Sequence, residues 1–231
     1  MHVTAVIPAA GTGVRMGGAV SKPFLLLGGM PLLARTLLRL SRSQIIDAYV
    51  LVVPPGTEEI CEKTVVAASA VPAAARIVPG GPVRQASVRA GLQALPAGTD
   101  LVVVHDGARP CVPVAVVRET VEAAARDGAA VAAVPATETV KEAGTDGRVL
   151  RTLPRERLWI AQTPQAFARA LILEAHAAAA AEGFLGTDDA VLVERLGRSV
   201  TLVPGSAENI KVTHPADLEL AARLLAAQGE G

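Results

Sequence analysis

The chain of 231 residues has few aromatic side chains, few cysteines and no excess of either charge. Aromatic residues make up only 2% of the sequence although 51% is hydrophobic, so the core must consist mainly of smaller aliphatic side chains. The two cysteines, Cys61 and Cys111, are too few for a disulfide framework and lack metal-ligand spacing. Basic and acidic residues number 22 each, which excludes a general attraction to nucleic acid or to an anionic membrane. Any anion site must therefore come from a local cluster.

Long hydrophobic runs are also absent. The alanine-rich stretch at residues 170–185 contains Glu174, His176 and Glu182, and it falls short of the ~20 apolar residues that a membrane span needs. Residues 1–10 lead directly into a predicted strand, without the basic region or cleavage site of a signal peptide. We therefore expect a cytoplasmic protein that does not enter a membrane.

Short apolar segments alternate with amphipathic ones along the chain. Strands are predicted at residues 2–8, 49–53, 76–78, 101–104, 130–134 and 200–203. Helices are predicted at residues 32–40, from 57, at 87–95, 114–126, from about 168, at 188–196 and after Thr213. Thr213 is placed to cap that last helix, with Pro215 in its first turn. The alternation predicts a single α/β domain over residues 1–231, with a Rossmann-like, mostly parallel sheet and helices on both faces.

The pattern changes at about residues 136–157, which are mainly polar. Thr145-Asp146-Gly147 is a turn signal between two short segments, and strands on both sides of an Asp-Gly turn predict a β-hairpin. The hairpin has too few apolar residues for a core of its own, so it must pack on something else. We expect a dimerisation arm that packs on a second copy of the chain.

The segment PAAGTGVRMGG, residues 8–18, follows the first predicted strand and is itself followed by Lys22. Open α/β sheets bind ligands at this edge, and glycines let backbone amides approach phosphate oxygens closely. Small Ala9 and Ala10 leave room for a base or ribose, and Arg15 and Lys22 supply positive charge. The segment predicts a phosphate-binding loop, with a plain glycine-rich turn as the alternative.

Two common kinds of phosphate loop are excluded. No Asp or Glu precedes Asp47, whereas a dinucleotide fingerprint needs an acidic residue ~20 positions after its glycines. The glycine spacing also fails. After Gly11 and Gly13 the fingerprint requires a glycine at position 16, but the next glycine of this chain is Gly17. No Gly-Lys-Ser/Thr sequence is present, so the loop is not a P-loop.

Two further clusters follow predicted strands. After residue 104 comes His105-Asp106-Gly107-Ala108-Arg109, in which the carboxylate could meet a metal or a substrate hydroxyl and the arginine a phosphate. The alternative is an Asp–Arg pair that only caps the strand. We expect His105 to be packed or hydrogen-bonded rather than a base. Gly80-Gly81, followed by Arg84 and Ser87, either reads a base or phosphate or caps a helix.

These clusters, together with later ones, resemble one family, the 2-C-methyl-D-erythritol 4-phosphate cytidylyltransferases of the non-mevalonate isoprenoid pathway. The matching segments occur in the same order along the whole chain. They are residues 8–16 with Lys22, 80–88, 104–110, 138–141, Arg155 with 158–159, 162–165, 187–190 and 209–213.

The resemblance implies a nucleotide-diphospho-sugar-transferase-like fold, CTP, methylerythritol phosphate, Mg²⁺ held mainly through the phosphates, and a homodimer. It implies contacts to CTP from Ala9, Ala10, Gly11, Gly81 and Ser87. It implies substrate contacts from Asp106, Arg109, Thr139 and Thr163, and catalytic charges from Arg15, Lys22, Arg155 and Lys211. Arg155 and Thr163 would reach the substrate of the other subunit.

Departures from the family pattern are small. Gly107 stands where alanine is usual, and Ser21 and Pro23 flank Lys22 where proline and glutamine are common. Three other functions remain as alternatives: a cytidylyltransferase for ribitol 5-phosphate, a sugar-nucleotide synthase that uses UTP or GTP, and a nucleotide-binding module without catalysis. The last leaves the charges outside the glycine loop without a role.

Overall fold

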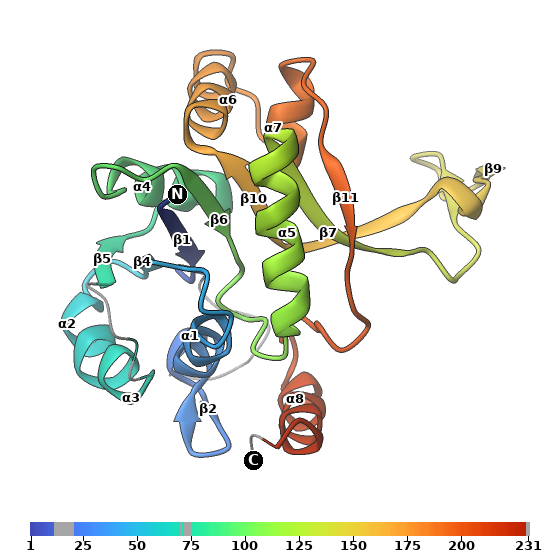
Figure 1. The fold of residues 1–231 in the computed structure, drawn as a ribbon. Coiled ribbons are helices and arrows are strands. Elements are labelled where there is room, and N and C mark those ends of the chain that lie inside the picture. The colour runs from blue at the N-terminus through green and yellow to red at the C-terminus, as the bar shows by residue number, and fades with distance from the viewer. Residues whose placement is uncertain (12–20, 70, 72–74, 230–231) are drawn as a thin grey trace.

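The computed structural model describes residues 1–11, 21–69, 71 and 75–229. Its centre is a sheet of seven strands in the order β11-β7-β10-β6-β1-β4-β5 (Figure 1). The strands are β1 (Val3–Pro8), β4 (Ala48–Val53), β5 (Ala75–Pro79), β6 (Leu101–Val104), β7 (Ala129–Pro135), β10 (Trp159–Ala168) and β11 (Thr201–Pro204). Six of them run parallel and β10 alone is antiparallel to its neighbours β6 and β7, which confirms the mostly parallel sheet.

The sequence patterns did not predict β10. Its middle is the polar run Gln162-Thr163-Pro164-Gln165, and proline is unusual in a central strand. The pairing of β10 with β7 shifts between Ala161 and Gln165, and the cis Thr163–Pro164 peptide lies within this irregularity. A bulge tolerates proline because the ladder is interrupted there, and it turns polar side chains toward one end of the sheet.

Helices cover both faces of the sheet, as the alternation predicts. Helices α1 (Leu32–Ser41) and α5 (Val114–Asp127) pack on the face that carries Val3 and Ile7 of β1. Helices α4 (Arg84–Gln93), α6 (Arg169–Ala181) and α7 (Ala190–Arg195) pack on the other face, which carries Val6. This alternation along β1 is the two-residue period of a strand buried on both sides.

The helix expected from residue 57 is divided into three short pieces. Helix α2 (Glu58–Cys61) continues through one π-helical segment, η3 (Glu62–Val66), into α3 (Ala67–Ser69). These pieces lie beside the end of the sheet formed by β4 and β5 (Figure 1).

The last helix, α8 (Pro215–Ala227), covers a small apolar cluster that includes Leu32 and Val212. The prediction that Thr213 caps it is wrong by one residue, because His214 occupies the N-cap position. Asp217 reaches back and accepts the backbone N–H groups of Thr213 and His214 at 2.7 and 2.8 Å. One carboxylate thus satisfies amides on both residues, and the Thr213 hydroxyl donates to it as well.

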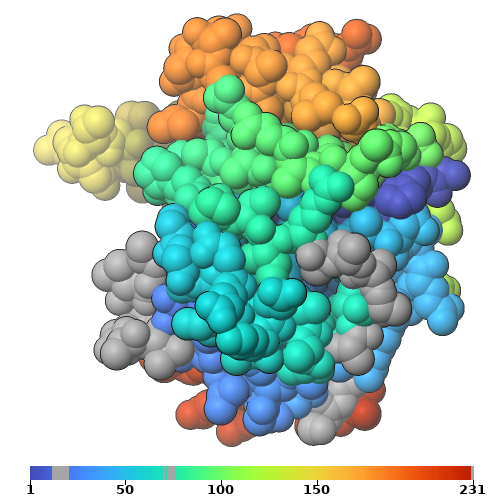
Figure 2. Space-filling model, turned by 90° about the vertical axis from the view of Figure 1, so that its left-hand side faces the viewer, coloured from blue at the N-terminus to red at the C-terminus, as the bar shows by residue number. Residues whose placement is uncertain are grey.

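The polar segment forms the predicted hairpin, with strands β8 (Lys141–Ala143) and β9 (Val149–Thr152). It is followed by a 3₁₀ turn, η4 (Arg155–Arg157), and it extends far from the rest of the molecule (Figures 1 and 2). Val149, Leu150 and Ile160 on the arm and at its base are more than half exposed.

A second small hairpin follows the η2 turn (Lys22–Phe24) and consists of β2 (Leu26–Leu27) and β3 (Met30–Pro31). Every helix among the described residues is too short or too polar to span a membrane.

Candidate active site

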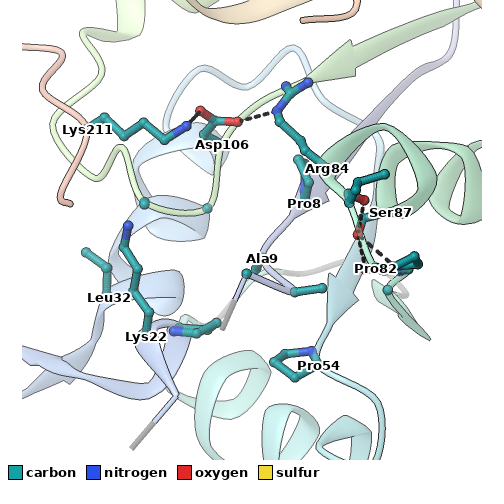
Figure 3. Close-up of a pocket in the computed structure, with 18 of the residues that line it drawn as sticks. Pro8, Ala9, Lys22, Leu32, Pro54, Pro82, Arg84, Ser87, Asp106 and Lys211 are labelled. Atoms are coloured by element: carbon teal, nitrogen blue, oxygen red, sulfur yellow. Dashed lines mark hydrogen bonds and ion pairs between the residues drawn. The ribbon is translucent and has the colours of Figure 1, made fainter. Parts of the chain in front are cut away.

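A cavity of about 790 Å³ opens where the parallel strands β1, β4, β5 and β6 end. This edge is where open α/β sheets bind ligands. Eight of the residues expected at a site line it: Ala9, Ala10, Gly11, Lys22, Gly81, Ser87, Asp106 and Lys211. They come from four distant parts of the sequence and surround one space (Figure 3). Arg15, expected beside them, lies outside the described residues.

The two glycine segments approach each other closely on one wall of the cavity. A Cβ atom on Gly80 would lie only 2.1 Å from the Cβ of Ala10, so no larger residue fits there without moving the loop. The Gly81 N–H donates to Ser87 Oγ at 3.1 Å. Ser87, in the first turn of α4, therefore holds the glycine segment in place and is itself almost completely buried. The result is a rigid wall of backbone and small side chains.

Lys22 lies on the opposite wall, in the η2 turn that precedes the small hairpin. Arg35 of α1 holds that hairpin, because its Nε donates to the Leu27 carbonyl at 3.1 Å and its Nη2 to the Gly28 carbonyl at 2.7 Å. Pro23, one of the departures from the family pattern, is buried in the first turn of η2, a position that suits proline.

Asp106 is the most heavily contacted charge of the site. Its Oδ1 accepts from Arg84 Nε at 3.1 Å, and its Oδ2 lies 2.7 Å from Lys211 Nζ and 3.9 Å from Arg109 Nε. Burial alone would raise the pKa of Asp106, but the charges of Arg84, Lys211 and Arg109 hold it well below its usual range. The carboxylate is therefore ionised. Its contacts with three cations go beyond an Asp–Arg pair that only caps the strand.

A smaller cavity of about 240 Å³ adjoins the first and shares Arg84, Asp106 and Lys211 with it. Arg109 and Thr163 line this second space. Thr163 Oγ1 accepts the backbone N–H of Asp106 at 3.0 Å, which connects the bulge of β10 to the end of β6. The site thus has two compartments that meet at one cluster of charges.

A network of buried amides fixes the floor of the smaller cavity. Arg109 Nη1 donates to the Asn209 carbonyl at 2.5 Å, and Asn209 Nδ2 donates to Gln162 Oε1 and to the Thr163 carbonyl. Gln165 Oε1 accepts the backbone N–H groups of Asp189 and Ala190.

The sequence reasoning did not assign a role to Arg84. Its guanidinium also donates to Asp189 Oδ2 at 2.7 Å, and burial and the two carboxylates act on it in opposite directions with a net rise of its pKa. The signal was present, since Arg84 follows Gly80-Gly81 within a matching segment, but its partners are 22 and 105 residues away.

The remaining expected residues, Thr139 and Arg155, lie on the arm. Both are exposed, and neither lines either of these two cavities. Arg155 Nη1 donates to the Thr137 carbonyl at 2.8 Å, a contact within the arm. A single chain therefore does not bring these two residues to the site.

His105 is packed inside the protein, in agreement with expectation. It is fully buried, and its Nε2 donates to the Arg109 carbonyl at 3.2 Å. Its Nδ1 has no hydrogen-bond partner among the described residues. A neutral ring with no access to either cavity is not a base for the site.

Gly107 has a packing reason for being smaller than alanine. A Cβ atom there would lie 2.9 Å from Leu33 Cδ1 and 3.0 Å from the Cβ of Ala9. An alanine would require Leu33 and the start of the glycine loop to shift by a few tenths of an ångström. Helix α1 and the loop therefore pack more closely on the end of β6 than a side chain at this position would allow.

The described residues offer no ligand set for a metal ion. They contain no group of three or more His, Cys, Asp or Glu side chains that could hold one. Asp106 is the carboxylate that lines both cavities, and each of its oxygens already contacts a cation. The donor set in this part of the chain therefore does not fit a resident metal bound by protein side chains.

Comparisons with known proteins agree with one another. The family model of 2-C-methyl-D-erythritol 4-phosphate cytidylyltransferase matches residues 3–227. A protein of that name from Pelotomaculum thermopropionicum is 49% identical over 226 residues, which cover 98% of this chain and 95% of the relative.

Solved structures give the same picture. The 2-C-methyl-D-erythritol 4-phosphate cytidylyltransferase of Thermus thermophilus is 40% identical with a TM-score of 0.78, over 98% of this chain and 100% of the other. The 4-diphosphocytidyl-2C-methyl-D-erythritol synthase of Anaerococcus prevotii is 32% identical with a TM-score of 0.86, over 97% and 98%.

We predict that acidification destabilises the fold through His105. Burial lowers the pKa of His105 from 6.5 to about 4, although its hydrogen bond to Arg109 acts in the opposite direction. Between these values the unfolded chain binds a proton that the folded chain does not. The free energy of unfolding should therefore fall by about 1.4 kcal/mol per pH unit as the pH decreases from about 6 to about 4.5.

Urea unfolding at several pH values measures this slope. His105→Gln, which cannot titrate, should flatten it. Equal slopes for His105→Gln and the wild type would contradict the prediction.

Proposed function

This chain belongs to the 2-C-methyl-D-erythritol 4-phosphate cytidylyltransferase family, and we propose that its two-compartment site carries out that reaction. CMP passes from CTP to 2-C-methyl-D-erythritol 4-phosphate, which yields 4-diphosphocytidyl-2-C-methyl-D-erythritol and pyrophosphate. The observation that carries the proposal is the junction of a glycine-walled cavity with a second, charged one at Asp106. The first suits a nucleotide and the second a small polar phosphate.

The larger cavity takes CTP. Ala9, Ala10, Gly11 and Gly81 line one wall of this cavity, and their backbone groups can come close to a flat base and a triphosphate. Ser87 holds that wall in place through its hydrogen bond with Gly81. Lys22 faces the same space from the opposite side, with Arg15 expected beside the triphosphate. A backbone wall reads a small base by its hydrogen-bonding edge with little cost of side-chain ordering.

The smaller cavity takes the acceptor. Asp106 is ionised and accepts hydrogen bonds from hydroxyl groups, while Arg109 and Lys211 supply positive charge for the phosphate. Thr163 lies at the same wall and fixes the backbone of Asp106. The acceptor phosphate then lies between this cavity and the CTP α-phosphate.

No protein nucleophile is required, because the phosphate of the acceptor attacks the α-phosphorus in line. A P–O bond forms between them as the bond to pyrophosphate breaks. The chain's work is to hold two anions together and to stabilise the charge that spreads over the α-phosphate oxygens. Lys22 and Arg15 act on the triphosphate, and Lys211 acts on the acceptor. Mg²⁺ would enter with CTP, held by phosphate oxygens, and would neutralise part of the charge.

The arm completes the site in a homodimer. Thr139 and Arg155 line neither of the two cavities, and the apolar side chains at positions 149, 150 and 160 are exposed in one chain. Exchange of arms between two copies would cover those side chains and bring the partner subunit's Arg155 to each acceptor. Residues 1–231 then act as one nucleotidyltransferase domain with a dimerisation arm at about 136–157. We place the enzyme in the cytoplasm, as the sequence predicts.

Pyrophosphate release tests the reaction directly. The purified protein with Mg²⁺, CTP and 2-C-methyl-D-erythritol 4-phosphate should release pyrophosphate in step with product. UTP in place of CTP, or ribitol 5-phosphate in place of the acceptor, should give turnover lower by a factor of about a hundred or more, since each leaves buried polar groups unpaired. Equal turnover with ribitol 5-phosphate would overturn the assignment of the acceptor.

Lys22→Ala should keep the fold and lose most of the activity. Removal of one preorganised charge costs on the order of 3 kcal/mol in the barrier, or about a hundredfold in kcat. Steady-state kinetics and a thermal melt measure both effects. Lys63→Ala, which removes an exposed lysine paired with Glu59, is the matched control and should retain full activity. Near-normal turnover by Lys22→Ala would remove it from the catalytic set.

Arm exchange predicts complementation between two inactive variants. Lys22→Ala and Arg155→Ala should each be inactive alone. In a heterodimer, one of the two sites regains both residues, so random mixing should restore about a quarter of wild-type activity. The mixture is equilibrated and assayed for turnover, with each variant alone as the control. Absence of any recovery, with heterodimers shown to form, would mean that each site is built within one chain.

A further inference from the structure

A line of buried polar contacts leads from helix α6 to the acceptor cavity. His176 of α6 donates from Nε2 to Asp189 Oδ1 at 3.0 Å. The other oxygen of Asp189 accepts from Arg84, and Arg84 in turn donates to Asp106. His176 and Asp189 are at most 2% exposed, and neither lines either of the two cavities described above. The chain of contacts is thus anchored in the core and ends at the site.

Arg84 stands at the junction of the two cavities and is shared by two carboxylates. Figure 3 shows its guanidinium directed toward Asp106, on the side opposite Lys211. A planar guanidinium can serve two acceptors in fixed directions, which an ammonium group cannot. The backbone N–H of Asp189 donates to Gln165 Oε1, which holds Asp189 in place. Arg84 is therefore bound to a carboxylate whose position is fixed.

The two strongest partners of Asp106 differ in how firmly they are held. The Lys211 side chain is 42% exposed, whereas that of Arg84 is 28% exposed and has the second carboxylate as a partner. An acceptor phosphate in the smaller cavity would compete with Asp106 for Lys211. A buried carboxylate that loses its cation is strongly destabilised, so this exchange needs a second cation that stays.

We propose that Asp189 and His176 are positioning residues for acceptor binding, because they fix Arg84 on Asp106 while Lys211 transfers to the acceptor phosphate. The inference rests on the proposed function and adds two residues that touch neither substrate. It separates the roles of the cations: Arg84 keeps Asp106 ionised and oriented toward the acceptor hydroxyls, and Lys211 is the one that changes partner.

The test is a comparison of the KM values for the two substrates. Asp189→Asn keeps the size of the side chain but removes its charge. It should raise KM for 2-C-methyl-D-erythritol 4-phosphate about tenfold and leave KM for CTP within about twofold, since residues in contact within one network are energetically coupled. Pyrophosphate release with Mg²⁺ and each substrate varied in turn gives both constants. A thermal melt of each variant confirms that it is folded at the assay temperature.

Gln85→Ala is the matched control. Gln85 is the neighbour of Arg84 and also ties α4 to the segment before Asp189, through hydrogen bonds to Phe184 and Gly186, but it lines neither cavity. It should leave both KM values unchanged. His176→Leu should raise the KM for the acceptor, and His176→Gln, which keeps an N–H donor, should restore it. If Asp189→Asn does not fold, this pair of variants tests the inference in its place.

Three results would overturn the inference: an unchanged acceptor KM in folded Asp189→Asn, equal rises of both KM values, or the same rise in Gln85→Ala. In each of these the wild type still turns over its substrates, and the proposed function stands. A wild type that releases no pyrophosphate from this substrate pair would instead refute the proposed function, and the inference with it.

Discussion

The site depends on one buried negative charge, the carboxylate of Asp106. A buried carboxylate is stable only with cations beside it, and here they come from the start of α4, from the segment after β6 and from the segment before α8. Satisfying this charge therefore fixes three segments that the sequence separates by up to 127 positions, from Arg84 to Lys211. The boundary between the two compartments follows from the same contacts. In the proposed function, the wall that faces the nucleotide can be built from backbone, whereas the cavity for the acceptor needs charges.

Local patterns predicted much of this molecule. The parallel strands and the hairpin could be predicted because each is encoded by neighbouring residues, as apolar runs and an Asp-Gly turn. Most of the predicted phosphate loop, residues 12–18, lies outside the described residues. The residues expected around CTP meet at one cavity for the same reason, since they follow strands whose carboxyl ends share an edge. The boundaries differ by only a few residues, as in the predicted strand at 130–134, observed as Ala129–Pro135.

The parts that were missed depend on contacts between distant residues. Strand β10 has a polar, proline-containing middle, and only its bulge between two neighbours explains why that sequence is a strand. The role of Arg84 depends on its contacts with two carboxylates, one of which is 105 residues away in the sequence. No rule of residue spacing reveals such distant partners. Thr139 and Arg155 could be named from a resemblance, but one chain leaves them on an exposed arm. Their proposed role depends on a second copy of the chain.

Strand β10 has a consequence for how two copies would work together. Its first residues pair with the end of β7 at the base of the arm, and its later residues include Thr163 and Gln165, which line the cavity of the same chain. With arms exchanged, this one strand would be continuous with parts of both catalytic centres. A displacement along it would then reach one centre through Thr163 and the other through the arm, so the two halves of a dimer would share a mechanical element without sharing a ligand.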